Sequence, residues 1–272
     1  LAAAPSQPLT GQMDVAALDI GQGMAVLVET AGHRLLYDTG PAYSPLSNAG
    51  NRVILPYLHA RGIDALDMLI VSHSDSDHSG GALSVLNGVP VAEVRSSLET
   101  SHPIVRAASH HSPCVAGQSW NWDGVRFEML HPGAASYDDP TLKPNARGCV
   151  LRVSAAAHAI LLAADIEAAQ EAQLVRATPA QLRADVLLAP HHGSGTSSTP
   201  PFLAAVAPTI ALFQVGYRNR YHHPQAGVFA RYGALGVERL RTDEGGALLL
   251  HFGASVDAQE YRRTHQRYWY GR

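Results

Sequence analysis

Short apolar runs separated by glycine turns make up the first part of the chain. Val15 to Ile20, Met24 to Glu29 and Arg34 to Tyr37 are joined by glycine-containing turns, which predicts a meander of three strands. Apolar positions at helical spacing then cover Arg52 to Arg61, and the apolar run Met68 to Val71 predicts a buried fourth strand. Strands followed by a strand-helix-strand unit indicate a mixed sheet with helices packed on its face.

The later part of the chain repeats this alternation of strands and helices. Its apolar runs predict further strands at Val91 to Arg95, Val125 to Leu130, Cys149 to Val153, Ala159 to Ala163, Asp185 to Ala189, Ile210 to Val215, Glu238 to Arg241 and Ala247 to His251. Helical patterns lie at Ala168 to Arg176 and Pro224 to Tyr232, and Gln118 to Gly124 is typical of a turn. The sequence therefore predicts two halves of similar architecture.

At 272 residues with 46% hydrophobic side chains, the chain has ample material for a sizeable core. We expect an N-terminal linker at 1–13, one domain at 14–251 and a C-terminal tail at 252–272. The tail lacks an apolar period, which leaves a coil and a nucleic-acid contact as alternatives. No apolar run approaches the roughly twenty residues that cross a bilayer, and the start lacks a signal-peptide pattern. Because the chain also begins without methionine, we expect a soluble piece of a longer protein.

The charge of the chain gives a mixed indication about nucleic acids. The formal net charge of −3 argues against a general nucleic-acid binder, because such domains usually carry an excess of basic residues. Arginines nevertheless gather in the final third of the chain, at Arg218, Arg220, Arg231, Arg239, Arg241, Arg262, Arg263, Arg267 and Arg272. Contact with phosphates and simple surface charge are equally compatible with this cluster.

The two cysteines, Cys114 and Cys149, lie far apart in the sequence. They do not form a CxxC pair, which argues against a zinc knuckle. Two buried thiols and one disulfide are both compatible with this spacing.

Four potential metal ligands, His73, Asp75, Asp77 and His78, follow the predicted fourth strand. They lie in a strand-to-helix loop, where alternate residues share a face, so three of them point together and His78 turns to the other side. Histidine with carboxylate is the ligand set of catalytic zinc and of harder divalent ions such as manganese. A polar loop that caps the next helix is the alternative, but capping needs one acceptor and no histidine. The motif therefore predicts two neighbouring metal ions.

Polar residues also close the strands of the second half. Asp165 stands between a predicted strand and a helix, as an N-cap or as a metal ligand. His191, His192 and Ser194 follow another buried strand, where a glycine-serine turn lets the chain approach a substrate oxyanion closely. The loop Tyr217 to Pro224 contains two arginines, two tyrosines, an amide and two histidines, a composition that suits an anion.

The motif His73-x-Asp75-x-Asp77-His78 resembles the metal motif of the metallo-β-lactamase superfamily, H-x-H-x-D-H, with Asp75 in place of the second histidine. With further segments in the expected order, the chain resembles the C-terminal, lactamase-like domain of the ComEC family of DNA-uptake channel proteins. Those segments are Leu18 to Gly23, Tyr37 to Gly40, Asn145 to Val150, Ala164 to Ile166, Pro190 to Ser194 and Tyr217 to Pro224. The resemblance covers roughly residues 14–250.

The resemblance implies an α+β fold, a four-layer αββα sandwich of two similar halves with the site at the sheet edge between them. The implied metal ligands are His73, Asp75, Asp77, His78, Asp165 and His191. The first two would hold one divalent ion and the next two a second ion, with Asp165 bridging both and His191 or His192 completing a shell. Because oxygen replaces nitrogen at Asp75 and at the nearest family position, Asn145, manganese and magnesium are as compatible with the site as zinc.

The activity implied by the resemblance is that of a metal-dependent nuclease, which hydrolyses phosphodiesters and degrades one strand of DNA during natural transformation. Asp77, His192 and His223 would take part in catalysis, and His223, with His222 as the alternative, would protonate the leaving 3′ oxygen. The implied substrate-binding residues are Asn145, Ser194, Arg218, Asn219, Arg220 and His222. DNA, single or double stranded, is the expected partner, and no small-molecule cofactor is expected.

Two other classes of function remain alternatives. The first is a small-molecule metallo-hydrolase of the thioesterase or lactonase type, which would act on an ester in a narrow pocket. The second is a non-catalytic DNA-binding module, against which the intact set of ligands argues.

The resemblance also implies a location. The parent protein would lie in the bacterial inner membrane, with this domain on the outer, periplasmic face beside the channel and N-terminal domains. In that oxidising space Cys114 and Cys149 are expected to pair.

Overall fold

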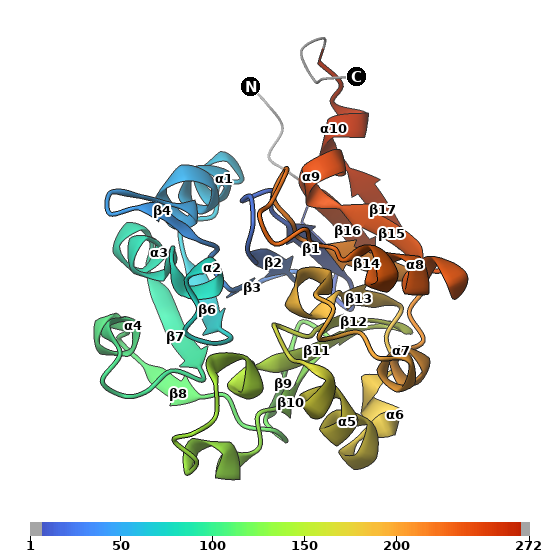
Figure 1. The fold of residues 1–272 in the computed structure, drawn as a ribbon. Coiled ribbons are helices and arrows are strands. Elements are labelled where there is room, and N and C mark those ends of the chain that lie inside the picture. The colour runs from blue at the N-terminus through green and yellow to red at the C-terminus, as the bar shows by residue number, and fades with distance from the viewer. Residues whose placement is uncertain (1–6, 268–272) are drawn as a thin grey trace.

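The computed structural model describes residues 7–267, in which two β-sheets pack face to face (Figure 1). The eight-stranded sheet has the order β17 (Val256–Glu260), β16 (Leu248–Phe252), β1 (Met13–Ala17), β2 (Val26–Glu29), β3 (Arg34–Tyr37), β6 (Leu66–Val71), β7 (Val91–Ser96) and β8 (His111–Pro113). The seven-stranded sheet has the order β15 (Glu238–Arg241), β14 (Ile210–Phe213), β13 (Val186–Leu188), β12 (His158–Leu162), β11 (Val150–Ala155), β10 (Val125–His131) and β9 (Ser119–Trp122). A small hairpin consists of β4 (Ala42–Ser44) and β5 (Ser47–Asn48).

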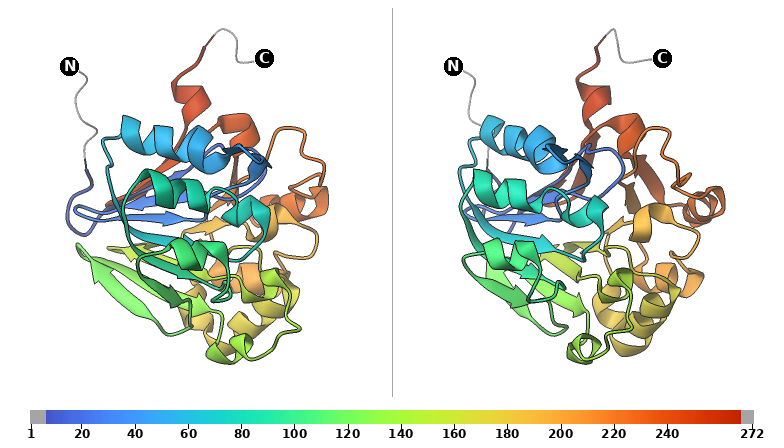
Figure 2. Two further views of the ribbon diagram at one scale, coloured as in Figure 1. Left: turned by 90° about the vertical axis from the view of Figure 1, so that its left-hand side faces the viewer. Right: turned by 60° about the vertical axis from the view of Figure 1, so that its left-hand side comes forward.

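Helices cover both outer faces of this pair of sheets. Over the eight-stranded sheet lie α1 (Leu55–Ala60), α3 (Ala82–Gly88) and α4 (Pro103–Ala107), as Figure 2 shows. Over the seven-stranded sheet lie α5 (Ala168–Ala177), α6 (Pro179–Leu182), α7 (Pro200–Val206) and α8 (Ala226–Ala234). Three short helices complete the description: α2 (Ser76–Ser79), α9 (Thr242–Gly245) and α10 (Tyr261–Thr264). The expected αββα sandwich is confirmed.

Each central strand contributes side chains both to the core between the sheets and to the core under the outer helices. Successive side chains of a strand point to opposite faces. Leu35 therefore packs between the sheets, whereas the next residue, Leu36, packs under the outer helices. Ile160 and Leu161 divide in the same way in the second sheet. Each central strand is thus apolar on both faces, which explains its nearly continuous apolar run.

Because neighbouring strands pair in parallel, the carboxyl ends that the predicted ligands follow lie at one edge of each sheet. β3, β6 and β7 are parallel neighbours in the first sheet, and β12, β13 and β14 are parallel neighbours in the second. The loops that follow the carboxyl ends of parallel strands share one side of a sheet, where ligands usually bind. The segments after β6, β12 and β13 are the ones that contain the predicted ligands.

The structure corrects the expected tail at 252–272. Residues 256–260 form β17, an edge strand that pairs antiparallel with β16. Val256 and Ala258 pack against the core between the sheets while the alternate side chains face outward, so this strand lacks the apolar run that predicts a strand. The outermost parts of the predicted linker and tail, residues 1–6 and 268–272, lie outside the described residues.

Two further predictions differ in detail. The expected turn at Gln118 to Gly124 contains a strand, β9, and only its end at Asp123 and Gly124 forms the turn into β10. The helix predicted at Arg52 to Arg61 begins as a π-helical turn at Gly50–Ile54 and continues as α1.

A disulfide joins the two sheets near the predicted metal motif. Cys114, just after β8, is bonded to Cys149, just before β11, with a Cα–Cα distance of 5.9 Å. The backbone N–H of Cys149 also donates to the carbonyl oxygen of Ser72 at 3.1 Å. The expected pairing is confirmed, and through Cys149 it contacts Ser72, the residue before His73. Among residues 7–267, no helix has the length and apolar character to span a bilayer.

Candidate metal centre

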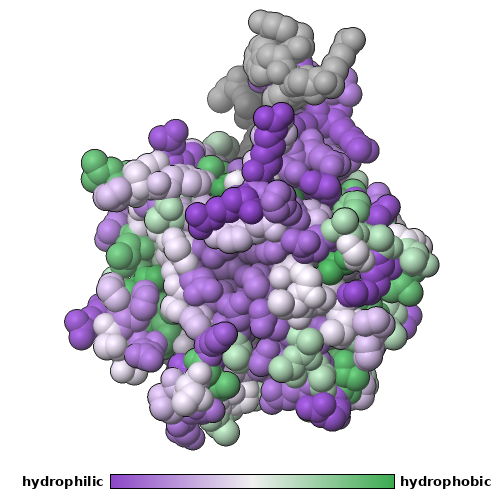
Figure 3. All heavy atoms as spheres, in the orientation of Figure 1, coloured by the Kyte–Doolittle hydropathy of each residue, from purple (hydrophilic) through white to green (hydrophobic). Residues whose placement is uncertain are grey.

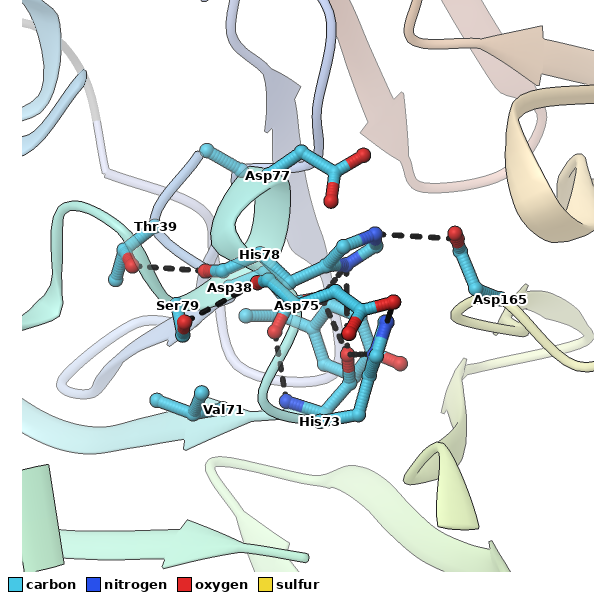
Figure 4. A network of polar contacts seen from close by, with 12 residues as sticks. Asp38, Thr39, Val71, His73, Asp75, Asp77, His78, Ser79 and Asp165 are labelled. Atoms are coloured by element: carbon cyan, nitrogen blue, oxygen red, sulfur yellow. Dashed lines mark hydrogen bonds and ion pairs between the residues drawn. The ribbon is translucent and has the colours of Figure 1, made fainter. Parts of the chain in front are cut away.

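One group of four side chains converges at the sheet edge between the two halves. Asp77 and His78 come from α2, Asp165 follows β12, and His192 follows β13. One ligand atom from each of them lies within 4.8 Å of the others. His78 Nε2 is 3.2 Å from Asp165 Oδ1 (Figure 4). His192 Nε2 is 3.4 Å from Asp77 Oδ2. Two imidazoles and two carboxylates are thus aimed at one point.

The chemistry of these donors fits a divalent cation. His78 Nε2, His192 Nε2 and Asp165 Oδ1 are buried and have no hydrogen-bond partner. Leaving such atoms without a partner costs about 1–3 kcal/mol each, so a ligand that satisfies all of them is favoured. Neutral imidazole nitrogen together with carboxylate oxygen suits zinc or manganese.

The Nδ1 atoms of His78 and His192 already have hydrogen-bond partners. His78 Nδ1 lies 2.8 Å from Asp38 Oδ2, and His192 Nδ1 lies 2.8 Å from the carbonyl oxygen of Gln214. These contacts fix the rings so that Nε2 faces the centre. Asp38 also accepts from the backbone N–H and the hydroxyl of Ser72, at 2.7 and 2.8 Å, so it is itself held in place.

The other predicted ligands, His191, His73 and Asp75, lie outside this group of four. His191 Nε2 is 3.5 Å from Asp165 Oδ2, whereas His78 and His192 approach Oδ1. His73 Nε2 is 3.6 Å from Asp75 Oδ2 and is also buried without a hydrogen-bond partner. The two oxygens of Asp165 therefore face different histidines, an arrangement compatible with a bridging carboxylate.

The left-handed backbone at His191 and His192 separates their side chains. Both residues have positive φ, 51° and 54°, a conformation that few non-glycine residues adopt. Their rings lie 6.5 Å apart at 64°. Because of this turn, neighbouring residues reach different sides of Asp165. The structure places His192, predicted for catalysis and as the alternative to His191 in a metal shell, in the four-residue group.

Charges in the cluster are strongly coupled. Burial works against ionisation of Asp77, but contact with His192 and the charge of His78 prevail and lower its pKa to about 2. Burial also opposes ionisation of Asp165, yet the charges of His78 and His192 hold its pKa well below the usual range. In return Asp165 and Asp38 raise the pKa of His78 well above its usual value in spite of burial. Both carboxylates are thus ionised at neutral pH, the form in which a carboxylate binds a metal ion.

His223 stands above the metal ligands at the end of the loop that follows β14. Its ring centroid is 5.8 Å from that of His191 and 6.4 Å from that of His192. Burial and the charges of His192 and His191 lower its pKa to about 4, so its imidazole is neutral at pH 7. A neutral ring keeps one N–H, and this residue is therefore placed as a hydrogen-bond donor beside the centre.

The remaining predicted substrate contacts lie around this centre. Arg218, Arg220 and His222 are exposed on the loop after β14, while the side chain of Asn219 binds inside that loop. Ser194 is buried, and its hydroxyl lies 3.1 Å from that of Thr196. Asn145 lies in the short 3-10 helix Pro144–Arg147 that precedes β11. Their roles in substrate binding stay predictions.

A pocket of about 370 Å³ adjoins the metal motif at Ser74. Ser74, which stands between His73 and Asp75, forms part of its wall. The other lining residues are Ser97, Leu98, Glu99, Ser101, His102, Pro140, Leu142, Pro144 and Arg147. In Figure 3 hydrophilic residues gather in the hollow at the centre of the face that carries the site.

Sequence reasoning missed Asp38 and Gln214 as parts of the site. Asp38 directly follows β3 and lies in the segment Tyr37 to Gly40, but its partner His78 is 40 residues away. Gln214 directly follows β14, and its amide also donates to the carbonyl oxygens of Leu18 and Ala25. A polar residue at the end of a buried strand was the available signal in both cases.

Comparison with known proteins agrees with this geometry. Residues 18–216 match the model of the metallo-beta-lactamase superfamily, and the chain belongs to that superfamily. Among solved structures, the metallo-beta-lactamase fold protein YhfI from Bacillus subtilis has a TM-score of 0.57 at 12% identity, covering 88% of this chain and 99% of its own. The diiron β-hydroxylase CmlA from Streptomyces venezuelae has a TM-score of 0.58 at 14% identity, covering 87% and 53%. These similarities concern the fold.

Curated relatives are more similar in sequence. The chain is 38% identical over 251 residues to competence protein ComA of Neisseria gonorrhoeae, and 33% identical over 263 residues to recombination protein 2 of Haemophilus influenzae. It is 30% identical over 263 residues to ComE operon protein 3 of Bacillus subtilis. The matches cover 92%, 97% and 88% of this chain but 34%, 32% and 33% of the relatives. The chain thus spans about a third of the length of these proteins.

Proposed function

We propose that the chain is a metal-dependent nuclease that hydrolyses phosphodiester bonds of DNA. The observation that carries the proposal is the convergence of Asp77, His78, Asp165 and His192 on one point at a hydrophilic, open sheet edge. The superfamily and this cluster together indicate a metal-dependent hydrolase. DNA is proposed as the substrate because the relatives bear competence and recombination names and because Arg218 and Arg220 are exposed on the neighbouring loop.

In this proposal some side chains bind the metal ions and others contact the DNA. Asp77, His78, Asp165 and His192 would hold one ion of manganese, zinc or magnesium, and His73, Asp75 and His191 would hold a second beside Asp165. Bound divalent ions supply Lewis-acid stabilisation of a phosphate and make water a better nucleophile. His223 donates a hydrogen bond toward the leaving oxygen, and Arg218 and Arg220 hold neighbouring phosphates.

One observation favours a second candidate, a small-molecule metallo-hydrolase. The pocket beside Ser74 has a volume of about 370 Å³, which is within the usual range for a small ligand, and Leu98 and Leu142 give it apolar walls. A thioester or lactone with a short acyl chain would fit such a pocket.

The experiment that separates these candidates is a parallel assay on the purified chain. Linear DNA, an acyl thioester and a lactone are each incubated with the protein in manganese, zinc or magnesium. We expect metal-dependent cleavage of DNA, abolished in Asp77→Asn and Asp165→Asn and retained in Asp64→Asn, an exposed aspartate just before β6. Ester hydrolysis without DNA cleavage would contradict the nuclease, and DNA cleavage that survives both site variants would contradict the site.

We also propose that the chain acts as the outer-face domain of a longer inner-membrane protein, next to its channel and N-terminal domains. The span of about a third of its relatives and the disulfide between Cys114 and Cys149 support this proposal. Protease treatment of intact spheroplasts should digest this domain in the parent protein. Protection of the domain until the membrane is ruptured would contradict an outer-face location.

A further inference from the structure

The loop between β14 and α8 exposes two aromatic rings that are not part of the hydrophobic core. Tyr217 is 74% exposed and Tyr221 is 45% exposed. An arginine lies over each ring: the Cζ atom of Arg218 is 5.2 Å from the centroid of Tyr217, and that of Arg220 is 4.8 Å from the centroid of Tyr221. Exposed aromatic rings next to cations are typical of surfaces that bind single-stranded nucleic acid. We call the segment Tyr217 to Tyr221 the tyrosine platform.

The tyrosine platform is held in shape before any ligand arrives. The side-chain amide of Asn219, at its centre, donates to the carbonyl oxygens of Gly216 and His223 at 3.1 and 2.6 Å. The same side chain accepts from the backbone N–H of His223 at 2.9 Å. Gln225 donates to the carbonyl oxygen of Tyr221 at 2.9 Å. A loop that is ordered in advance loses little conformational entropy when it binds.

The platform leads directly to the metal ligands. The ring of Tyr221 stacks on that of His223 with centroids 5.7 Å apart and an interplanar angle of 26°. His223 in turn stacks on the ligand His192 at 6.4 Å and 21°. Three nearly parallel rings thus connect the exposed loop with the centre. A strand that contacts the platform would have its adjacent phosphate close to the candidate metal site.

From this geometry we propose that the tyrosine platform binds unpaired bases, so that DNA reaches the metal centre as a single strand. The inference rests on the proposed nuclease function and names its substrate class. A base stacks on the open face of Tyr217, while Arg218 and Arg220 contact the flanking phosphates. In a duplex the faces of the bases are covered by their neighbours, so a paired strand gains the arginine contacts but not the stacking.

Binding of metal-free protein to DNA tests the platform without any turnover. A fluorescent single strand of about 12 nucleotides and a hairpin duplex are titrated in chelator. We expect Tyr217→Ala/Tyr221→Ala to weaken single-strand binding about 5- to 100-fold, the usual effect of removing stacking, and to leave duplex binding unchanged. Tyr217→Phe/Tyr221→Phe should retain single-strand binding because it keeps both rings. Tyr261→Ala, which removes a 40% exposed tyrosine on α10, is the matched control and should bind like the unchanged protein.

Abasic DNA separates stacking from charge. The unchanged protein should bind a single strand with abasic sites more weakly than the normal strand, and the double alanine variant should bind the two equally. Equal binding of both strands by the unchanged protein, or an equal loss in Tyr261→Ala, would overturn the inference. So would an unchanged affinity of the double alanine variant for the normal strand. These outcomes differ from a failure of the nuclease proposal, which would appear as normal binding of single strands without metal-dependent cleavage.

Discussion

Asp38 sets the geometry of the candidate metal site although it does not point at the centre. It is fully buried and contacts Nδ1 of His78, so it determines that Nε2 of this ring faces Asp165. Its other contacts, with Ser72, tie it to the end of β6. Partners of this kind orient a ligand and raise its basicity.

Replacing Asp38 should therefore weaken metal binding more than it weakens the fold. In Asp38→Asn the affinity for Mn²⁺ should fall about 10- to 100-fold, since outer partners of metal ligands usually contribute that much. Titration of metal-free protein with Mn²⁺ measures this change, and activity should recover at saturating metal. Asp67→Asn, which alters a carboxylate that accepts from the backbone of Arg34, is the matched control. An unchanged affinity in Asp38→Asn would remove the positioning role.

His223 is expected to affect turnover without affecting metal content. It lies against His191 and His192 but outside the group of four converging ligands. Removing a hydrogen-bond donor to a developing negative charge usually lowers kcat about 10²- to 10³-fold. In His223→Ala we expect that loss of kcat on DNA with the same metal content by mass spectrometry, whereas His59→Ala, which alters an exposed histidine of α1, should stay active. Loss of metal in His223→Ala would instead make this residue a ligand.

The sequence predicted the ligand loop His73 to His78 better than it predicted the residues that hold the ligands in position. His73, Asp75, Asp77 and His78 are close in sequence, so their spacing alone indicates a shared site. Asp38 has no such neighbour, because its contact depends on the parallel pairing of β3 with β6. The division between His191 and His192 was equally hidden, since it follows from two consecutive left-handed residues.

Among the secondary-structure elements, the turn between β9 and β10 is tied to the turn between β2 and β3. Asp123 accepts from the hydroxyl of Thr30 and the backbone N–H of Gly32, both at 2.6 Å, and contacts His33 Nδ1 at 3.0 Å. These contacts with His33, Thr30 and Gly32 lower the pKa of Asp123 to about 2. One carboxylate thus links the two sheets at an end of the sandwich.

Because of this link, the free energy of unfolding should depend on pH in the acid range. The pKa of Asp123 is depressed in the folded chain, so its contribution is present above about pH 4 and is lost as the pH falls through 2. Asp123→Ala should lower the free energy of unfolding at pH 7 by about 1 kcal/mol, the lower end for hydrogen bonds to a charged group, because the site is partly exposed to solvent. Urea unfolding at pH 7, 4 and 2 should show that the difference between the two proteins is clearly smaller at pH 2 than at pH 7. A constant difference across this range would contradict the assignment.

Strands with continuous apolar runs were predicted well, and two amphipathic edge strands were not. β9 and β17 each bury only alternate residues, Trp120 and Trp122 in one and Val256 and Ala258 in the other. At the rim of a sheet one face is solvated, so short runs rich in polar residues resemble turns or coil. The central strands have two buried faces and therefore give the stronger pattern.

For the domain as a whole, the disulfide between Cys114 and Cys149 is the one covalent cross-link between side chains of the described residues. It closes a loop with a sequence separation of 35, for which loss of chain entropy in the unfolded state corresponds to roughly 3–4 kcal/mol. Reduction, or Cys114→Ser/Cys149→Ser, should lower the free energy of unfolding by about that amount in urea titrations. Reductant should have no effect on the serine variant, and equal stability of the oxidised and reduced protein would contradict the prediction.

The place of β1 has a consequence for how the protein is made. β1 is the first strand of the domain, and its partners are β2 on one side and β16 on the other. During synthesis β1 therefore lacks one of its two neighbours until residues 248–252 have been made. Up to that moment one edge of β1 has no partner, so a chain stopped before residue 248 should be captured by chaperones or degraded rather than accumulate as a half-built enzyme.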